Sequence, residues 1–227
     1  MLSGILFLAL TLAIYLISKK IYAVKTKVYL SPLIITPLLI ISFLLMMGVS
    51  FDSYNAGGKW LTDLLQPATV AFAIPLHKNF KVLKKHAAEI AAGVLSGTMM
   101  AVISSVLLAH WLHLSSNLAT SLVPRSVTTP IAMNISQSIG GIPSITAVFV
   151  ILTGVLGTLI GPTVLRLFRI DNEVARGVSL GTAAHGMGTS KAFELSSLTG
   201  TISSIAMILT ALFTLTVAPA LLAVFLH

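Results

Sequence analysis

The stretch Gly181-Thr182-Ala183-Ala184-His185-Gly186-Met187-Gly188-Thr189-Ser190-Lys191 places a histidine, three glycines and several hydroxyl groups inside a chain that is otherwise strongly apolar. A plain membrane-spanning helix does not contain such an interruption, because glycine loosens a helix and polar side chains find no partners in lipid. The stretch therefore predicts a break in a helix, at a place that faces something other than lipid.

The composition of the whole chain indicates a membrane protein. Of the 227 residues, 56% are hydrophobic and only 9% are charged, and the mean hydropathy is +1.00. A soluble domain would carry roughly a quarter charged residues. Since a helix needs roughly 20 apolar residues to cross a bilayer, we expect an all-α polytopic membrane helical bundle with about seven or eight transmembrane segments. Residues 1–227 would form a single integral membrane domain.

Apolar runs and their interruptions suggest the order of the segments. Long helices are predicted over residues 1–17, 32–49, 87–108, 142–167 and 199–225. Broken or re-entrant helices are predicted over residues 61–76, 118–139 and 178–195, where proline, glycine and polar residues interrupt the apolar pattern. The polar residues 52–59 are expected to form an external loop.

Basic residues indicate the orientation of the chain. Eleven of the fourteen lysines and arginines fall in residues 19–27, 78–85 and 166–176. The positive-inside rule makes these loops cytoplasmic and the N-terminus external. Full crossings alone would put residues 166–176 outside, so residues 118–139 are expected to enter and leave on the external side. The net charge of +8 is spread between apolar runs, so it does not indicate a nucleic-acid partner.

The segments also suggest an internal repeat. A long helix, an irregular segment and a second long helix occur over residues 32–108 and again over residues 142–225. The orientation argument makes the two units face opposite ways, and such inverted repeats build the binding sites of many secondary transporters near the bilayer midplane. The alternative is that any chain of apolar helices shows similarities of this kind.

Arg125 is the most informative charged residue. Pro124 precedes it and Pro130 follows it, which predicts a helix, an extended loop and a new helix that begins near Pro130. The free amide groups and positive dipole at that helix start, together with a guanidinium, would suit a small carboxylate or phosphate. The alternative is an arginine that extends to the lipid headgroups. The neighbouring candidate ligands are Ser126, Thr128 and Thr129.

His185 has three possible roles: it could carry a proton, bind a substrate oxygen or hydrogen-bond a neighbouring helix. Gly186 and Gly188 would let a ligand or another backbone approach closely. Thr189 adds a hydroxyl group, and Lys191 is either a second cation for an anion or the partner of Glu194 on the helix surface.

The first broken segment contributes one more candidate, Thr69, whose surroundings carry no charge and would supply backbone and hydroxyl groups, unless the segment is merely a kinked helix. Signatures of enzymes are missing from the sequence: it has no GxSxG or HExxH motif, no phosphate-binding loop and no cysteine. We therefore expect no catalytic activity, no cofactor and no metal site.

Three motifs in order support a family resemblance. They are Pro124-Arg125-Ser126-Val127-Thr128-Thr129-Pro130-Ile131-Ala132, Ile139-Gly140-Gly141-Ile142-Pro143-Ser144-Ile145-Thr146-Ala147 and residues 181–189, and Pro67-Ala68-Thr69-Val70-Ala71 agrees with them. Together they resemble the LrgB/CidB family of bacterial membrane proteins over nearly the whole chain. The family usually has lysine where this chain has Arg125, so the charge is kept while the geometry of the donor differs.

The resemblance implies two kinds of function. Members are described as holin-like or antiholin-like modulators of murein hydrolases and autolysis that act with a small LrgA/CidA-type membrane protein. Relatives include the plastid glycolate/glycerate translocator and bacterial pairs linked to pyruvate movement. Because broken helices with a buried arginine and histidine suggest a bound polar ligand, we expect a carrier of small monocarboxylates in the bacterial cell membrane. A homo-oligomeric holin-type pore without a substrate site is the alternative.

Overall fold

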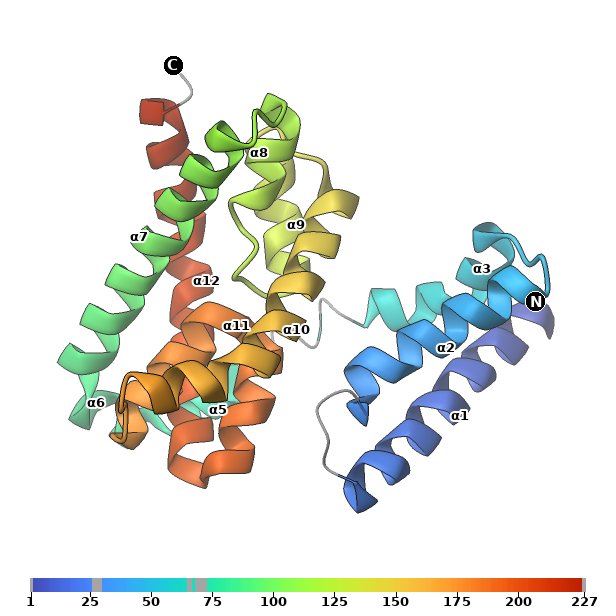
Figure 1. The fold of residues 1–227 in the computed structure, drawn as a ribbon, viewed down its shortest axis with the longest axis horizontal. Coiled ribbons are helices and arrows are strands. Elements are labelled where there is room, and N and C mark those ends of the chain that lie inside the picture. Colours follow the sequence, from blue (N-terminus) through green and yellow to red (C-terminus); the bar gives the residue numbers. More distant parts are fainter. Residues whose placement is uncertain (1, 26–29, 65–66, 68–72, 226–227) are drawn as a thin grey trace. The chain divides into compact units, whose positions relative to one another are not determined.

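The computed structural model describes residues 2–25, 30–64, 67 and 73–225, and in this part of the chain every regular element is a helix (Figure 1). The helices form two compact units, Met1–Ala68 and Thr69–His227. Four helices of the described residues are long and apolar enough to cross a membrane: Gly4–Val24, Ala87–Trp111, Pro143–Leu167 and Ser197–Ala220. The protein is therefore a polytopic helical membrane protein. A shorter apolar helix, Ile34–Met46, is not long enough to belong to this set.

The first unit contains α1 (Leu2–Val24), α2 (Pro32–Met46) and α3 (Phe51–Asp63). Helices α1 and α3 pack closely because Gly57 has no side chain: a Cβ atom there would collide with the backbone of Gly4. The hydroxyl groups of Thr11 and Tyr54 lie 3.1 Å apart across the same contact.

Two expectations for this unit were wrong. The polar residues 52–59, expected as an external loop, belong to α3. The helix forms because Ser50 caps it: the Ser50 hydroxyl accepts a hydrogen bond of 3.3 Å from the Ser53 amide. The first helix also continues past its predicted end at residue 17 and reaches Val24, since Lys19 and Lys20, which follow that end, are good helix formers.

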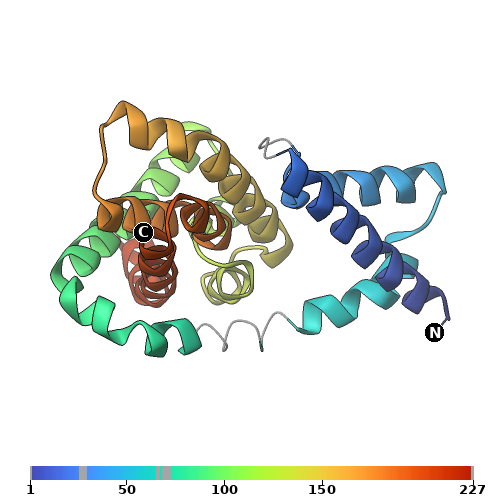
Figure 2. The ribbon, with the colours of Figure 1, turned by 90° about the horizontal axis from the view of Figure 1, so that it is seen from below.

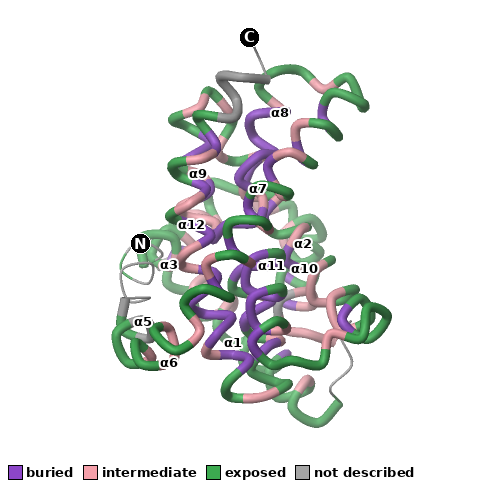
Figure 3. The backbone as a smooth tube through the Cα atoms, turned by 90° about the vertical axis from the view of Figure 1, so that its left-hand side faces the viewer, coloured by how far each residue is buried: buried purple, intermediate pink, exposed green. Residues whose placement is uncertain are grey.

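The second unit contains the remaining elements. Its long, unbroken helices are α7 (Ala87–Trp111), α10 (Pro143–Leu167) and α12 (Ser197–Phe225). Helix α12 contacts α7, α9 and α11 (Figure 2). Buried residues concentrate where α7, α11 and α12 meet, whereas the outward faces are exposed (Figure 3). The elements are α5 (Ala73–Lys78), α6 (Phe80–Lys85), α7 (Ala87–Trp111), α8 (Ser116–Leu122), α9 (Thr129–Ser138), α10 (Pro143–Leu167), α11 (Glu173–Leu195) and α12 (Ser197–Phe225).

Helix α11 contains the stretch quoted first and folds back on itself. Ala184 (φ −133°, ψ 19°) and His185 (φ 40°, ψ −133°) leave the helical conformation. The hydroxyl of Ser196, one residue beyond the helix, donates to the carboxylate of Glu173 at its start. A straight helix of this length would separate its ends by about 34 Å. The two limbs of α11 are therefore antiparallel, and Ala184 and His185 form the tip of a hairpin.

Contacts within the hairpin agree with this path. Leu180 and Ala192 belong to one buried cluster, although twelve residues separate them in the sequence. A Cβ atom at Gly188 would collide with the carbonyl group of Leu180. The glycine thus permits the close approach of the two limbs.

Helices α8 and α9 form a second hairpin. The hydroxyl of Thr146, in the first turn of α10, donates to the Ser121 carbonyl of α8 (3.0 Å) and to the Ser136 hydroxyl of α9 (2.6 Å). The Ile142 amide also donates to the Ser121 hydroxyl, at 2.7 Å. Both limbs of this hairpin therefore meet the start of α10, and residues 123–128 form its tip.

The tips of the two hairpins lie near the middle of the long helices. Val127, in the first tip, packs against Val150 of α10 and Ala211 of α12. Ala184, in the second tip, lies against Gly157 of α10. The broken segments thus turn inside the unit, which accounts for fewer long spans than the seven or eight expected from the sequence.

Cross-linking tests the folded-back path of α11. In the variant Glu173→Cys/Ser196→Cys, we expect a disulfide to form on mild oxidation, because the two side chains are in contact. The pair Glu173→Cys/Ala184→Cys is the control, since about 16 Å of helix separates those positions. The chain has no cysteine of its own, so a mobility shift on a non-reducing gel reports the bond. Failure of the first pair to cross-link faster than the control would contradict the hairpin.

Candidate functional site

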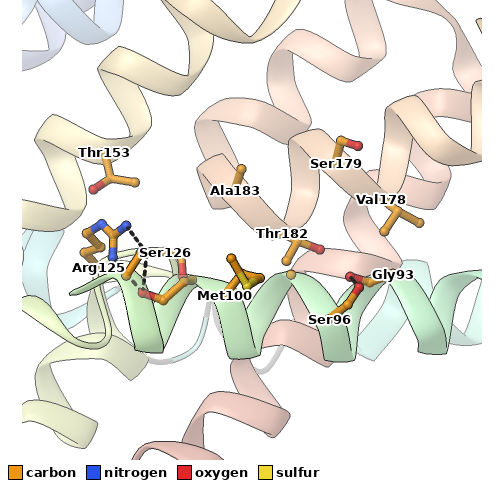
Figure 4. Close-up of a pocket in the computed structure, with 13 residues that line it drawn as sticks. Gly93, Ser96, Met100, Arg125, Ser126, Thr153, Val178, Ser179, Thr182 and Ala183 are labelled. Carbon is orange, nitrogen blue, oxygen red and sulfur yellow. Dashed lines mark hydrogen bonds between the residues drawn. The ribbon is translucent and has the colours of Figure 1, made fainter. Parts of the chain in front are cut away.

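A cavity of about 600 Å³ lies in the second unit between α7, the tip of the α8–α9 hairpin, α10 and the first limb of α11 (Figure 4). Each of these elements contributes small or hydroxylated residues. The lining residues are Gly93, Ser96, Gly97, Met100, Ala101, Ser104, Arg125, Ser126, Thr153, Val178, Ser179, Thr182 and Ala183.

Arg125 extends from the hairpin tip to the middle of α7. Its Nη1 donates to the Ala101 carbonyl oxygen at 3.0 Å and to the Ser105 hydroxyl, and its Nη2 donates to the Ser104 hydroxyl at 3.3 Å. The guanidinium is only partly buried and lines the cavity. With five N–H donors, it keeps donors for a ligand while α7 holds it in place.

The electrostatic character of the cavity is positive. Among the described residues that line it, Arg125 is the one charged residue and none is acidic. Five hydroxyl groups besides that of Ser126 come from Ser96, Ser104, Thr153, Ser179 and Thr182. A guanidinium with hydroxyl groups around it suits a small oxyanion, since these groups donate hydrogen bonds to carboxylate oxygens.

The wall formed by α7 is one part of the site that the sequence did not predict. Its contributing residues recur at intervals of three and four along one face, which is the spacing of a helical stripe. The sequence does show small and hydroxylated residues within this apolar helix. They do not by themselves indicate a cavity, because close packing of two helices explains such residues equally well. The stripe consists of Gly93, Ser96, Gly97, Met100, Ala101 and Ser104.

The segment around Arg125 differs in detail from the prediction. The expected extended loop is a pair of turns, because the Arg125 amide donates to the Leu122 carbonyl (3.2 Å) and the Val127 amide to the Pro124 carbonyl (3.1 Å). Thr128, the residue before α9, is extended (φ −60°, ψ 140°). Helix α9 begins at Thr129 with Pro130 in its first turn, as the sequence predicts.

The predicted ligands from this segment divide into two groups. Arg125 and Ser126 line the cavity, whereas Thr128 and Thr129 do not. The Thr128 hydroxyl is buried and has no hydrogen-bond partner in the described part of the chain. A role of Thr128 or Thr129 in binding stays a prediction.

His185 lies at the tip of the α11 hairpin, outside the lining of the cavity. It is buried, and its Nε2 lies 3.0 Å from the carbonyl oxygen of Val150. A Cβ atom at Gly154 would come within 2.9 Å of the imidazole, so the glycine makes room for the ring. Of the three roles considered, the hydrogen bond to a neighbouring helix is the one that these contacts support.

The other candidates from α11 have partners or positions away from the cavity. The Thr189 and Ser203 hydroxyls lie 3.0 Å apart, and Lys191 pairs with Glu194 at 2.5 Å. Gly186 is exposed, and Gly188 lies between the two limbs of the hairpin. Instead, Val178, Ser179, Thr182 and Ala183 of the first limb line the cavity. Thr69 lies outside the described residues.

We expect His185→Ala to lower the stability of the protein by about 1–3 kcal/mol, because it removes a buried hydrogen bond and leaves space around Gly154. Lys191→Ala is the comparison, and loss of its partly exposed ion pair costs less than about 1 kcal/mol. Thermal unfolding of the purified protein in detergent measures both. An unfolding temperature for His185→Ala equal to or above that of Lys191→Ala would show that the hydrogen bond to Val150 does not fix the hairpin tip.

Comparison with known proteins places this architecture in a family. Residues 11–224 match the model of the LrgB-like family. The chain is 63% identical to Uncharacterized protein YwbG of Bacillus subtilis, over 96% of this chain and 97% of that protein. It is 36% identical to Holin-like protein CidB of Staphylococcus epidermidis, over 99% and 98% of the two chains. It is 34% identical to Holin-like protein CidB of Staphylococcus aureus, over 98% and 97%.

No solved structure matches the chain. The family match extends over both units and includes the cavity and the two hairpins. The protein therefore belongs to the LrgB-like family.

Proposed function

We propose that the protein is a membrane transporter for small monocarboxylates of the pyruvate, glycolate or glycerate type. The observation that carries the proposal is the position of Arg125, whose guanidinium lines an open cavity of about 600 Å³ in the second unit and lies at the middle of the apolar helix α7. A charge within a membrane protein is costly and usually marks a pathway or a ligand site. Such a cavity needs neither a cofactor nor a catalytic residue for this function.

The contacts of Arg125 fit a binding site better than a structural ion pair. Its partners are a carbonyl group and two hydroxyls, all neutral. The positive charge is therefore not neutralised by any described residue that lines the cavity. A carboxylate could neutralise it and accept hydrogen bonds from the guanidinium and from the Ser126 hydroxyl.

The architecture supports a carrier with an inverted repeat. We infer that the repeat consists of residues 87–138 and 143–195, in place of the boundaries 32–108 and 142–225 expected from the sequence. Each half has a helix of 25 residues followed by a folded-back hairpin. The first hairpin begins where α7 ends and the second where α10 ends, so the two would re-enter from opposite sides. Such broken helices commonly form transporter sites near the midplane.

The location of the basic residues supports the proposed orientation. A second cavity, of about 350 Å³, is lined by Glu89 near the start of α7 and by Asn172 before the start of α11. The basic residues 78–85 and 166–176 flank these positions, so they lie at the same end of the second unit. We propose that this end is cytoplasmic, that the N-terminus is external and that the protein spans the bacterial cell membrane several times.

Association with other proteins belongs to the proposal as well. A small LrgA/CidA-type membrane protein and further copies of this chain are the expected partners, and altered carboxylate flux would change murein hydrolase activity and autolysis indirectly. The second candidate function is a holin-like pore or its antagonist, which the name of the CidB relatives, holin-like protein, favours. A pore of that kind would leak without saturation.

Uptake by reconstituted vesicles separates these functions and tests the site. We expect saturable uptake of labelled pyruvate or glycolate, and we expect Arg125→Ala to raise the half-saturating concentration at least about tenfold, because hydrogen bonds to a charged group contribute about 1.5–3 kcal/mol. Arg125→Lys keeps the charge and should retain part of the uptake.

Lys59→Ala is the control, because it removes an exposed positive charge of the first unit that lines neither cavity and lies outside residues 78–89 and 166–176. Uptake by this variant should equal that of the unchanged protein. Saturable uptake that Arg125→Ala leaves unchanged would reject the site, whereas non-saturable leakage through the unchanged protein would favour the holin-like function. Measurements with and without the small partner show whether that protein is required.

A further inference from the structure

The two cavities of the second unit adjoin at one helix contact. Gly93, Val178 and Ser179 line both of them. One cavity extends to Arg125 in the middle of α7, and the other extends to Glu89 and Asn172 at the starts of α7 and α11. A path therefore follows the contact between α7 and the first limb of α11. We call the end of the unit at Glu89 and Asn172 the basic end.

The walls of this path meet closely at two glycines. A Cβ atom at Gly93 would lie 2.7 Å from Cγ1 of Val178, and one at Gly97 would lie 2.7 Å from Cγ2 of Thr182. Ser96 and Ser179 are exposed on the two facing helices. The path is thus lined by small and hydroxylated residues, which provide hydrogen bonds for a hydrated anion.

The opposite side of Arg125 is closed by apolar packing. We call the end where α7 stops and α8 begins, between Trp111 and Ser116, the far end. At the level of Arg125, Val102 of α7 packs in one buried cluster with Val123 at the first hairpin tip, and nearer to the far end Ala109 of α7 packs with Leu122 of α8. Val102 and Val123 are almost completely buried. None of these four residues lines either cavity.

Charges near the basic end favour the entry of an anion. Residues 78–89 and 166–176 contain seven basic and three acidic residues. The carboxylate of Glu89, which lines the outer cavity, lies 2.7 Å from Nδ1 of His86. A rim with excess positive charge raises the local concentration of anions.

We propose that Arg125 is reached from the basic end along the α7–α11 contact, that Ser96 and Ser179 line this access route, and that the apolar layer of Val102, Val123, Ala109 and Leu122 closes the far end. The described conformation is then accessible from the basic end and closed toward the far end. The identity of the anion in this proposal rests on the proposed function. The route itself rests on the two cavities.

Single cysteines test the route directly, because the chain has none. Ser96→Cys and Ser179→Cys are prepared together with two side markers, Lys84→Cys at the basic end and His113→Cys at the far end, both exposed. Right-side-out and inside-out vesicles are treated separately with a membrane-impermeant methanethiosulfonate reagent. The fraction of each cysteine that is modified is measured by mass spectrometry.

We expect Ser96→Cys and Ser179→Cys to be modified only from the side that modifies Lys84→Cys, and not from the side that modifies His113→Cys. Modification from the His113 side, or no modification from either side while both markers react, would overturn the proposed route. Two positions on facing helices keep the test valid if one variant fails to fold. The labelling needs no substrate, so absence of monocarboxylate uptake would reject the proposed function without altering this result.

Discussion

The requirement that backbone polar groups have partners within a membrane governs this structure. A helix satisfies them internally, and a broken helix is tolerated only where protein or a water-filled cavity replaces the missing partners. The two breaks of the second unit obey this rule. Residues 123–128 form two turns with their own hydrogen bonds, and the tip at Ala184 and His185 lies against α10. The long helices α7, α10 and α12 therefore shelter both tips from lipid.

The same requirement explains how Arg125 is held. A guanidinium needs partners for five N–H groups, and α7 supplies a carbonyl and two hydroxyls at one level of the helix. These partners are neutral, so they fix the orientation of the side chain without cancelling its charge. A negatively charged ligand can then interact with the positive charge of the guanidinium and accept hydrogen bonds from the N–H groups that α7 leaves free. The way in which one hairpin tip packs against α7 thus accounts for the proposed preference of the cavity for an anion.

His185 illustrates how a residue can be prominent in the sequence and structural in the fold. Its backbone has a positive φ, which side chains rarely adopt, and its ring is held by the Val150 carbonyl. Together these features set the point at which α11 reverses. The first limb, which precedes His185, is then brought to the cavity, and the second limb packs against α12 through Thr189 and Ser203.

The sequence by itself determined the membrane class, the helical content, the interruption near His185 and the family, because composition, apolar run length and motifs are local properties. It also singled out Arg125 from its prolines and hydroxyls. Tertiary structure decided which residues line the cavity together with Arg125: the stripe on α7 and the first limb of α11, instead of His185 and Lys191. A broken helix can continue, bend or reverse, and the choice depends on contacts between residues far apart in the chain, such as Glu173 with Ser196 and Gly188 with Leu180. Small residues of one helix likewise line a cavity only where the facing helix lies far enough away to leave space. The separation between two helices cannot be read from a single sequence.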